Sequence, residues 1–222
     1  MSATIHEQSD QFKAAAAKRL PPEVVAVFDR SIEHFLAEGV PAEAVKVGDR
    51  LATFTLDDAT GKPVSLDQLV AAGPAVIVFY RGGWCPYCNL ALHAYQQELL
   101  PQLDAFGARL VAISPQSPDQ SLTTAEKAGL AFAVLSDPGS RVAQSIGIAF
   151  QQADDVLAAQ RQLGLDLAKV NAEGATYLPR PTVLIVDRTQ TVRFVDVQPD
   201  YTARTEVADI LAALARLETG RP

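Results

Sequence analysis

The stretch VFYRGGWCPYCNLAL, residues 78–92, contains both cysteines of the 222-residue chain. It overlaps AVIVFY (75–80), a β-branched and aromatic run that is typical of a strand buried on both faces. The loop RGGW then turns the chain. A helix is expected to begin at about Cys85 or Pro86, because proline is well tolerated in a first helical turn. The stretch therefore predicts a strand, a short loop and a helix with Cys85 and Cys88 at its N-terminus.

The segments around this stretch predict an alternation of strands and helices. A hairpin is expected in LATFTLDDATGKPVSL, which alternates and is broken by Gly61 and Pro63. Further strands are expected at 108–114, 132–137, 182–187 and 191–197, and helices at 90–106, 123–129, 140–147 and 204–217. Parallel strands need crossover helices, and the final pair is antiparallel, so the fold class is α/β with a mixed central sheet flanked by helices. With the cysteine pair at the end of the first buried strand, this is the order of a thioredoxin-like fold.

Two further segments are expected to add helices to that fold. Residues 1–45 predict an N-terminal helical extension with an apolar stripe of Val24, Phe28, Ile32, Phe35 and Leu36. The stripe should cover the main domain or a second subunit, so a homodimer is one expectation. Residues 46–222 form the expected main domain, with a helical insertion at about 151–170.

Composition narrows the classes of partner. The formal net charge is -7 and the 19 lysines and arginines are scattered, which argues against a nucleic-acid partner. No apolar run approaches the roughly 20 residues of a membrane-spanning helix, and residues 1–20 lack the apolar region of a secretory signal. A cytoplasmic location is therefore expected. A permanent disulfide is disfavoured in that reducing compartment, whereas a cycling one is not.

The position of the two thiols favours redox chemistry. A thiol at a helix N-terminus faces free N–H groups and the positive end of the helix dipole, and both favour the thiolate, which is the attacking species. The spacing of three residues brings the second sulfur within reach of the first, so that a disulfide can form and be released.

Other interpretations of the pair remain open. Free cysteine is common as a small buried hydrophobe. A zinc site needs four ligands, and the only histidines, His6, His34 and His93, lack the required spacing. An iron–sulfur cluster shared across a dimer would need ligands from outside the chain. The redox interpretation requires no metal and no organic cofactor.

Residues near the pair are candidates for substrate binding. Arg81 could stabilise the thiolate or hold a peroxide oxygen, or it could be a solvated loop charge. Trp84 could shield Cys85 or fill a gap. Pro181 directly precedes the buried strand at 182–187 and is either an ordinary turn proline or a proline that lies against the disulfide.

The chain resembles the peroxiredoxin-like branch of the alkyl hydroperoxide reductase/thiol-specific antioxidant family, within the thioredoxin superfamily. The matching stretches cover roughly residues 45–217: VFYRGGWCPYCNLAL, LVAISPQSPDQSLTTAEKAGL, FAVLSDPGSRVAQSIGI, RQLGLDLAKVNAEGATYLPRPTVLIVD and DYTARTEVADILAAL. The resemblance implies a thioredoxin fold, reduction of peroxides or disulfides, and electrons from thioredoxin or a similar thiol donor. It also favours a cis peptide bond at Pro181.

The resemblance does not settle which cysteine attacks. Peroxiredoxins carry Pro-x-x-x-Thr-x-x-Cys after the first strand, which would place the attacking cysteine at Cys88 but finds Arg81 and Cys85 at the other two positions. Thioredoxins carry Trp-Cys-x-x-Cys, which matches residues 84–88 and makes Cys85 the attacking residue. Peroxiredoxins also place an arginine where this chain has Pro181, and Arg180 is one residue away. Because Cys85 should lie at the more exposed mouth of the helix, we expect Cys85 to attack and Cys88 to resolve.

The expected activity is that of a thiol-dependent peroxidase. Cys85 and Cys88 would reduce hydrogen peroxide or alkyl hydroperoxides, with Arg81, Trp84, Arg180 and Pro181 lining the site. The first alternative is a protein-disulfide reductase of thioredoxin type without significant peroxidase activity. The second is a non-enzymatic scaffold that binds a partner through the added helices.

Overall fold

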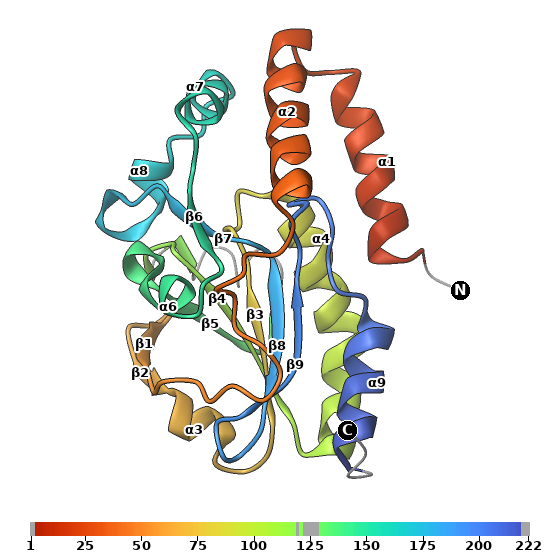
Figure 1. Cartoon of the computed structure of the whole chain (residues 1–222), viewed down its shortest axis with the longest axis vertical. Coiled ribbons are helices and arrows are strands. Elements are labelled where there is room, and N and C mark those ends of the chain that lie inside the picture. The colour runs from red at the N-terminus through yellow and green to blue at the C-terminus, as the bar shows by residue number, and fades with distance from the viewer. Residues whose placement is uncertain (1–2, 119, 122–128, 219–222) are drawn as a thin grey trace.

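The computed structural model describes residues 3–118, 120–121 and 129–218. The described residues form a seven-stranded mixed sheet in the order β2-β1-β5-β4-β3-β8-β9, and a separate pair of strands, β6 and β7 (Figure 1). The strands are β1 (Thr55–Asp58), β2 (Pro63–Ser65), β3 (Ala75–Phe79), β4 (Arg109–Ser114), β5 (Ala133–Ser136), β6 (Ala149–Gln151), β7 (Tyr177–Pro179), β8 (Thr182–Val186) and β9 (Val192–Val197).

Helices cover both faces of the sheet and extend beyond one end of it. The α-helices are α1 (Ile5–Ala17), α2 (Pro22–Glu38), α3 (Leu66–Val70), α4 (Pro86–Ala94), α6 (Arg141–Ser145), α7 (Asp154–Gln162), α8 (Leu167–Val170) and α9 (Val207–Glu218). A π-helical turn, η1 (Tyr95–Leu99), and three 3₁₀ segments, η2 (Leu100–Phe106), η3 (Pro138–Ser140) and η4 (Ala172–Gly174), complete the elements of the described residues. The predicted α/β fold with a mixed sheet flanked by helices is confirmed.

Strand β3 is the strand that delivers the cysteines. It pairs in parallel with β4 and antiparallel with β8, so that Ile77 lies between Val111 and Leu184. All five of its residues are buried, as the continuous apolar run predicted. Because both neighbours fix its register, the residues that follow β3 are held at a defined point on the end of the sheet.

The two faces of the sheet carry separate apolar cores. One lies beneath α4 and α9 and contains Val76, Val78 and Leu92. The other lies on the side of α3 and α6 and contains Ile77 and Phe79. The side chains of β3 alternate between the two cores, as the period of two in a strand requires.

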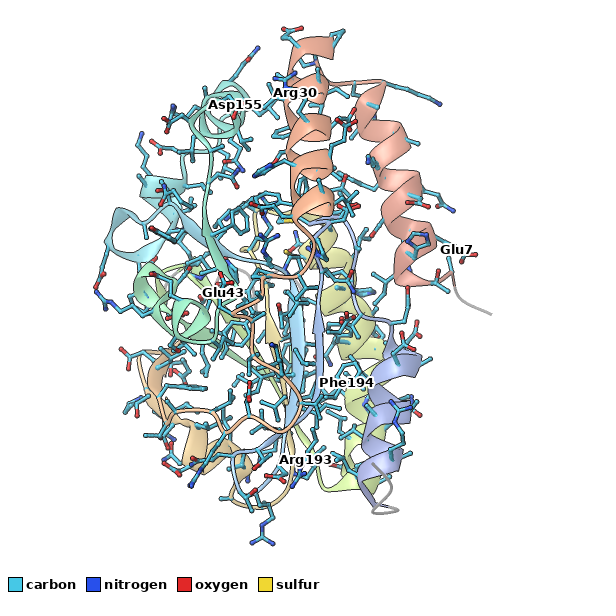
Figure 2. All side chains as sticks on the ribbon, viewed as in Figure 1. Glu7, Arg30, Glu43, Asp155, Arg193 and Phe194 are labelled. Atoms are coloured by element: carbon cyan, nitrogen blue, oxygen red, sulfur yellow. The ribbon has the colours of Figure 1, made fainter. Side chains whose placement is uncertain are left out.

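The N-terminal extension consists of α1 and α2. Helix α1 packs against α4, and α2 packs against α7. Arg30 of α2 and Asp155 of α7 form an exposed ion pair at 3.8 Å, and both are labelled in Figure 2. Glu206 accepts hydrogen bonds at 2.8–3.1 Å from the backbone nitrogens of His6 and Ile5, which anchors the start of α1 to the segment before α9. The helical extension is therefore bound to the rest of the chain at both of its helices.

Some sequence-based predictions differ from the structure. Gln151 belongs to β6, and the predicted insertion consists of α7 and α8 with a loop between them. The last helix starts at Val207 rather than at 204, which leaves residues 204–206 in a non-helical segment. The helix predicted at 123–129 falls almost wholly outside the described residues. None of the described helices is long and apolar enough to cross a membrane.

Candidate active site

The loop between β3 and α4 brings the two cysteines to the start of the helix. Gly82 has a φ of 144°, and a Cβ atom there would collide with the indole of Trp84, so only glycine fits this position. Cys85 is the N-cap of α4 with extended backbone angles, and Pro86 is the first helical residue. The Cys85 carbonyl accepts the backbone N–H of Cys88 at 3.1 Å. The predicted strand, loop and helix N-terminus are confirmed.

Both sulfurs are buried, and Cys85 borders a cavity. Cys85 is 1% exposed and Cys88 is 0% exposed. The two side chains hydrogen-bond to each other. Cys85 lines a cavity of about 470 Å³, whereas Cys88 does not. The expectation that Cys85 lies at an exposed helix mouth is therefore wrong as to solvent exposure, although Cys85 is the sulfur that small molecules in the cavity would meet.

Arg204 is the charged group closest to the sulfur pair. Its Nη2 donates to Cys88 Sγ at 3.0 Å and lies 3.8 Å from Cys85 Sγ. Its Nη1 donates to the carbonyls of Tyr201 and Ala203, so the guanidinium is held by its own segment. Tyr95 Oη donates at 2.7 Å to the carbonyl of Thr205, which ties that segment to η1. Arg204 is therefore a fixed, buried cation beside Cys88.

The surroundings give the two thiols opposite pKa shifts. Burial raises the pKa of Cys85 well above its ordinary value, and the neighbouring Cys88 sulfur raises it further. Burial also opposes ionisation of Cys88, but the hydrogen bond from Cys85, the Arg204 charge and a backbone hydrogen bond from Arg81 together lower the pKa of Cys88 well below its ordinary value. Of the two sulfurs, Cys88 is therefore the one whose thiolate form the surroundings favour.

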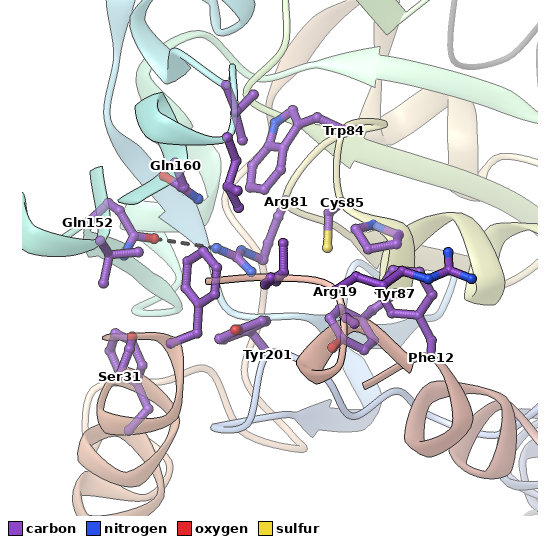
Figure 3. Close-up of a pocket in the computed structure, with 18 of the residues that line it drawn as sticks. Phe12, Arg19, Ser31, Arg81, Trp84, Cys85, Tyr87, Gln152, Gln160 and Tyr201 are labelled. Atoms are coloured by element: carbon purple, nitrogen blue, oxygen red, sulfur yellow. Dashed lines mark hydrogen bonds between the residues drawn. The ribbon is translucent and has the colours of Figure 1, made fainter. Parts of the chain in front are cut away.

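Arg81 lies beside the pair, inside the cavity wall. Its guanidinium carbon is 4.3 Å from the ring centre of Tyr201 and 5.0 Å from that of Trp84. Its Nη2 donates to Gln152 Oε1 at a long 3.4 Å. Figure 3 shows Arg81, Cys85, Tyr201 and Gln152 around one space. The sequence therefore correctly grouped Arg81 and Trp84 with Cys85, while their role in substrate binding stays a prediction.

Arg180 and Pro181 do not line this cavity. Arg180 pairs with Glu38 of α2 at 2.9 Å and stacks at 4.6 Å on the ring of Phe35. It lines a second cavity of about 440 Å³ that neither cysteine borders. Pro181 is buried and its carbonyl accepts the Gln198 N–H at 2.9 Å. The described residues contain no cis peptide bond, so the expectation of a cis bond at Pro181 is wrong.

Several residues around the sulfurs were not identified from the sequence. Arg204 and Tyr201 come from the segment before α9, more than a hundred residues after Cys85. Gln152 follows β6, and Phe12 and Phe28 belong to the extension. Tyr201 and Arg204 lie in the stretch DYTARTEVADILAAL, which carried the family resemblance but gave neither residue a role at the site. Among the described residues, no group of three or more His, Cys, Asp and Glu side chains is arranged to hold a metal ion.

Comparison with known sequences gives one family and partial relatives. A family model described as the AhpC/TSA family matches residues 47–195. The chloroplastic peroxiredoxin Q of Sedum lineare is 33% identical over 104 residues, which are 47% of this chain and 55% of that protein. The chloroplastic peroxiredoxin Q of Triticum aestivum is 28% identical over 130 residues, 59% of each protein. The chain thus spans little more than half the length of these relatives.

Comparison with solved structures supports the same fold. The peroxidoxin BcpB of Mycobacterium tuberculosis is 25% identical, with a TM-score of 0.62 over 80% of this chain and 99% of that one. The predicted thioredoxin-like architecture is confirmed.

Proposed function

Because the chain belongs to the AhpC/TSA family, in the peroxiredoxin branch of the thioredoxin superfamily, we propose that it is an enzyme that reduces hydrogen peroxide and alkyl hydroperoxides with the thiols of Cys85 and Cys88. The observation that carries the proposal is the sulfur pair itself. Two hydrogen-bonded thiols lie at a helix N-terminus beside the Arg204 cation, and one of them borders a cavity. No metal or organic cofactor takes part in this cycle.

Access and charge divide the roles of the two sulfurs. Cys85 borders the cavity, so its sulfur meets the peroxide. Cys88 carries the negative charge at rest and acts as the base that accepts the Cys85 proton. Arg204 is a positioning residue, because its hydrogen bond keeps that charge on Cys88 until the substrate arrives.

The cycle balances in three steps. The Cys85 thiol gives its proton to the Cys88 thiolate, and the Cys85 sulfur attacks one peroxide oxygen. The O–O bond breaks, Cys85 becomes a sulfenic acid, and the departing alkoxide or hydroxide takes a proton from solvent. The Cys88 sulfur then attacks the Cys85 sulfur, the S–OH bond breaks, and water leaves with the Cys88 proton. The product is an internal disulfide.

A dithiol donor must then return two electrons to the disulfide. We propose thioredoxin or a similar thiol protein as that donor, which the family supports. The reducing cytoplasm is the proposed compartment, and both cysteines are free thiols in this structure. Val24, Ile32 and Phe35 of the N-terminal stripe are buried within the chain itself, so they need no second subunit to cover them. A homodimer stays a prediction.

Rapid mixing of the reduced protein with hydrogen peroxide tests the proposal. We expect oxidation of the thiols faster than that of free cysteine by at least about 100-fold, a gain that corresponds to nearly 3 kcal/mol of barrier. Intact mass after one equivalent of peroxide should show the loss of two hydrogens, and thioredoxin with its reductase should restore the original mass. Oxidation no faster than that of free cysteine would overturn the proposal of a peroxidase. If the protein then reduces the disulfides of insulin, the alternative of a protein-disulfide reductase remains.

A further inference from the structure

A short non-helical segment before α9, residues 201–206, connects the sulfur pair to the first helix of the chain. Arg204 donates to Cys88 Sγ at 3.0 Å. Two residues later, the Glu206 carboxylate accepts the backbone N–H groups of the first two residues of α1 at 2.8–3.1 Å. The segment and α1 both lie outside the family-matched residues 47–195. The connection is therefore a feature of this chain rather than of the matched core.

The Arg204 guanidinium depends on the sulfurs for a counter-charge. Among the described residues, its hydrogen-bond partners are the carbonyls of Tyr201 and Ala203 and the two sulfurs, and none of these is a carboxylate. Arg204 is 9% exposed, so water does little to solvate it. A buried charge that loses its partner is strongly destabilising. The disulfide of the proposed cycle carries no charge, and its formation therefore leaves this cation unpaired.

The carboxylate of Glu206 is close enough along the chain to take the place of the thiolate. Glu206 is half-buried, so a guanidinium that turns toward it also gains contact with water. Arg204 lowers and Glu206 raises the pKa of Tyr95, which places both side chains near the same ring. A hydrogen bond between two charged groups is stronger than one from a neutral N–H group. A released Arg204 should therefore displace the N–H groups of α1 from this carboxylate.

A second set of contacts links the same segment to the middle of α1. The Phe12 ring of α1 meets the Tyr87 ring edge-on, with ring centres 5.3 Å apart, and Tyr87 meets Tyr201 at 6.0 Å. The three rings are labelled in Figure 3. Because the Tyr201 carbonyl is one of the acceptors of Arg204, a movement of Arg204 also disturbs this stack. Helix α1 would thus be loosened at its start and at its middle.

We propose that Arg204 and Glu206 form a redox latch that holds α1 over Cys85 only while the two thiols are reduced. In the reduced protein, Arg204 is bound to the Cys88 sulfur and Glu206 is bound to α1. When the disulfide between Cys85 and Cys88 forms, Arg204 turns to Glu206, and α1 is released from the cavity wall. Reduction of the disulfide restores the thiolate, which binds Arg204 again. The proposal rests on the proposed function only for the source of the disulfide.

Amide hydrogen exchange of α1 tests the redox latch. Diamide forms the internal disulfide by accepting two electrons and two protons from the thiols, so this test does not require peroxide reduction. We expect the amides of residues 5–10 to exchange about fivefold faster in the oxidised wild type, the effect of losing one helix cap. The amides of β3 and β4 serve as the reference and should not change.

The outcomes separate the redox latch from the proposed function. Faster exchange of α1 after diamide treatment, in a protein that does not reduce peroxide, would support the latch while the proposed function fails. Equal exchange of α1 in the reduced and oxidised wild type would overturn the latch and leave the proposed function intact. Intact mass establishes that the oxidised sample has lost two hydrogens.

Variants of the two latch residues separate the latch from a general loosening on oxidation. In Arg204→Met no cation is released, so oxidation should change the exchange of α1 by less than about twofold. In Glu206→Gln, α1 should exchange at about the fast rate in both redox states, because its anchor is already weakened. Glu206 is half-buried, so this second variant keeps the test decisive if Arg204→Met does not fold. A fivefold difference that persists in either folded variant would overturn the latch.

Two controls complete the experiment. Arg193→Met removes an exposed arginine of β9 that pairs with Asp187, and it should keep the full difference between the redox states. The double variant Cys85→Ser, Cys88→Ser contains no thiol, so diamide should leave the exchange of its α1 unchanged. Loss of the difference in Arg193→Met, or faster exchange in the double variant after diamide, would show that the effect does not come from the latch, and the proposal would fail.

Discussion

The family-matched region and the segments on either side of it contribute different parts of the candidate site. Residues 47–195 supply β3, α4 and both cysteines. The flanking segments supply the Arg204 guanidinium beside Cys88 and the apolar walls from α1 and α2. The comparison teaches that the shared fold places the two sulfurs, whereas the flanking segments place a cation beside Cys88 and supply part of the cavity wall beside Cys85.

Replacement of the cysteines tests the contribution of the matched region and should have the largest effect. We expect Cys85→Ser to lower the rate of peroxide reduction by about 1,000-fold or more, because the attacking sulfur is gone. Steady-state turnover with thioredoxin as donor measures the loss. Cys88→Ser should also oxidise more slowly, because the base that accepts the Cys85 proton is gone, but its oxidation should stop at a Cys85 that has gained one oxygen, which intact mass detects. The same oxygen on Cys88 of the Cys85→Ser variant, formed at the wild-type rate, would reverse the two roles.

Replacement of Arg204 tests the contribution of the C-terminal flank. Without the cation beside it, the Cys88 thiolate loses its main charge partner, so the pKa of Cys88 should rise. The pH profile of thiol oxidation should therefore move to higher pH in Arg204→Met, and the rate at neutral pH should fall about 10- to 100-fold.

The control variants of Arg204 separate charge from packing. Arg204→Lys keeps a cation and should therefore retain part of the low-pH activity that Arg204→Met loses. The recovery should be only partial, because an ammonium group does not fully replace the guanidinium fork. Arg193→Met removes an arginine of β9 that pairs with Asp187 on the surface, and it should leave the pH profile in place. An unchanged profile in a folded Arg204→Met protein would remove Arg204 from the site.

Replacement of Glu38 tests whether its ion pair with Arg180 contributes to stability rather than to catalysis. Arg180 is buried and Glu38 is about half exposed, so Glu38→Gln should cost about 1–2 kcal/mol of unfolding free energy, less than a fully buried pair. Urea denaturation measures this loss. In both Glu38→Gln and Arg180→Lys, the rate of peroxide reduction should stay within twofold of the wild-type rate. A tenfold loss of kcat/KM in Arg180→Lys would place Arg180 at the substrate, as the sequence first predicted.

Replacement of Glu206 should have the smallest effect. Its carboxylate accepts two backbone N–H groups at the start of α1, where a negative charge is favoured by the helix dipole. Glu206→Gln should cost about 0.5–1 kcal/mol, a fall in Tm of about 1–4 °C. Glu33→Gln on the exposed side of α2 is the control. An equal fall in both variants would show that Glu206 does not anchor the extension.

Local sequence patterns predicted the sheet and the position of the sulfurs. The apolar run 75–80 and the proline after Cys85 depend only on neighbouring residues, so their structural consequences could be derived directly. The solvent exposure of Cys85 could not be derived in this way, because helices α1 and α2 and the segment before α9 cover the Cys85 side chain. Periodicity predicted the apolar stripe of α2 but not which surface would bury it.

Contacts between distant segments account for the remaining differences. The pattern at 204–217 extended the last helix back to Arg204, whereas the helix begins at Val207 and Arg204 reaches the sulfurs from a non-helical segment. Arg180 was expected at the site because peroxiredoxins place an arginine where this chain has Pro181, one residue away, but its side chain lies with Phe35 and Glu38 of α2. Nothing near either arginine in the sequence distinguishes these outcomes, because both depend on tertiary packing.

The burial of Cys85 has a consequence for recycling. A peroxide is small enough to diffuse through the cavity, but thiol–disulfide exchange requires a donor's sulfur to approach the Cys85–Cys88 bond from a protein-sized surface. Residues of α1 and α2 line the cavity beside Cys85, so a donor of that size can reach the disulfide only if these helices move away. We therefore expect recycling by a protein donor to depend on that movement, and recycling by a small dithiol to depend on it less.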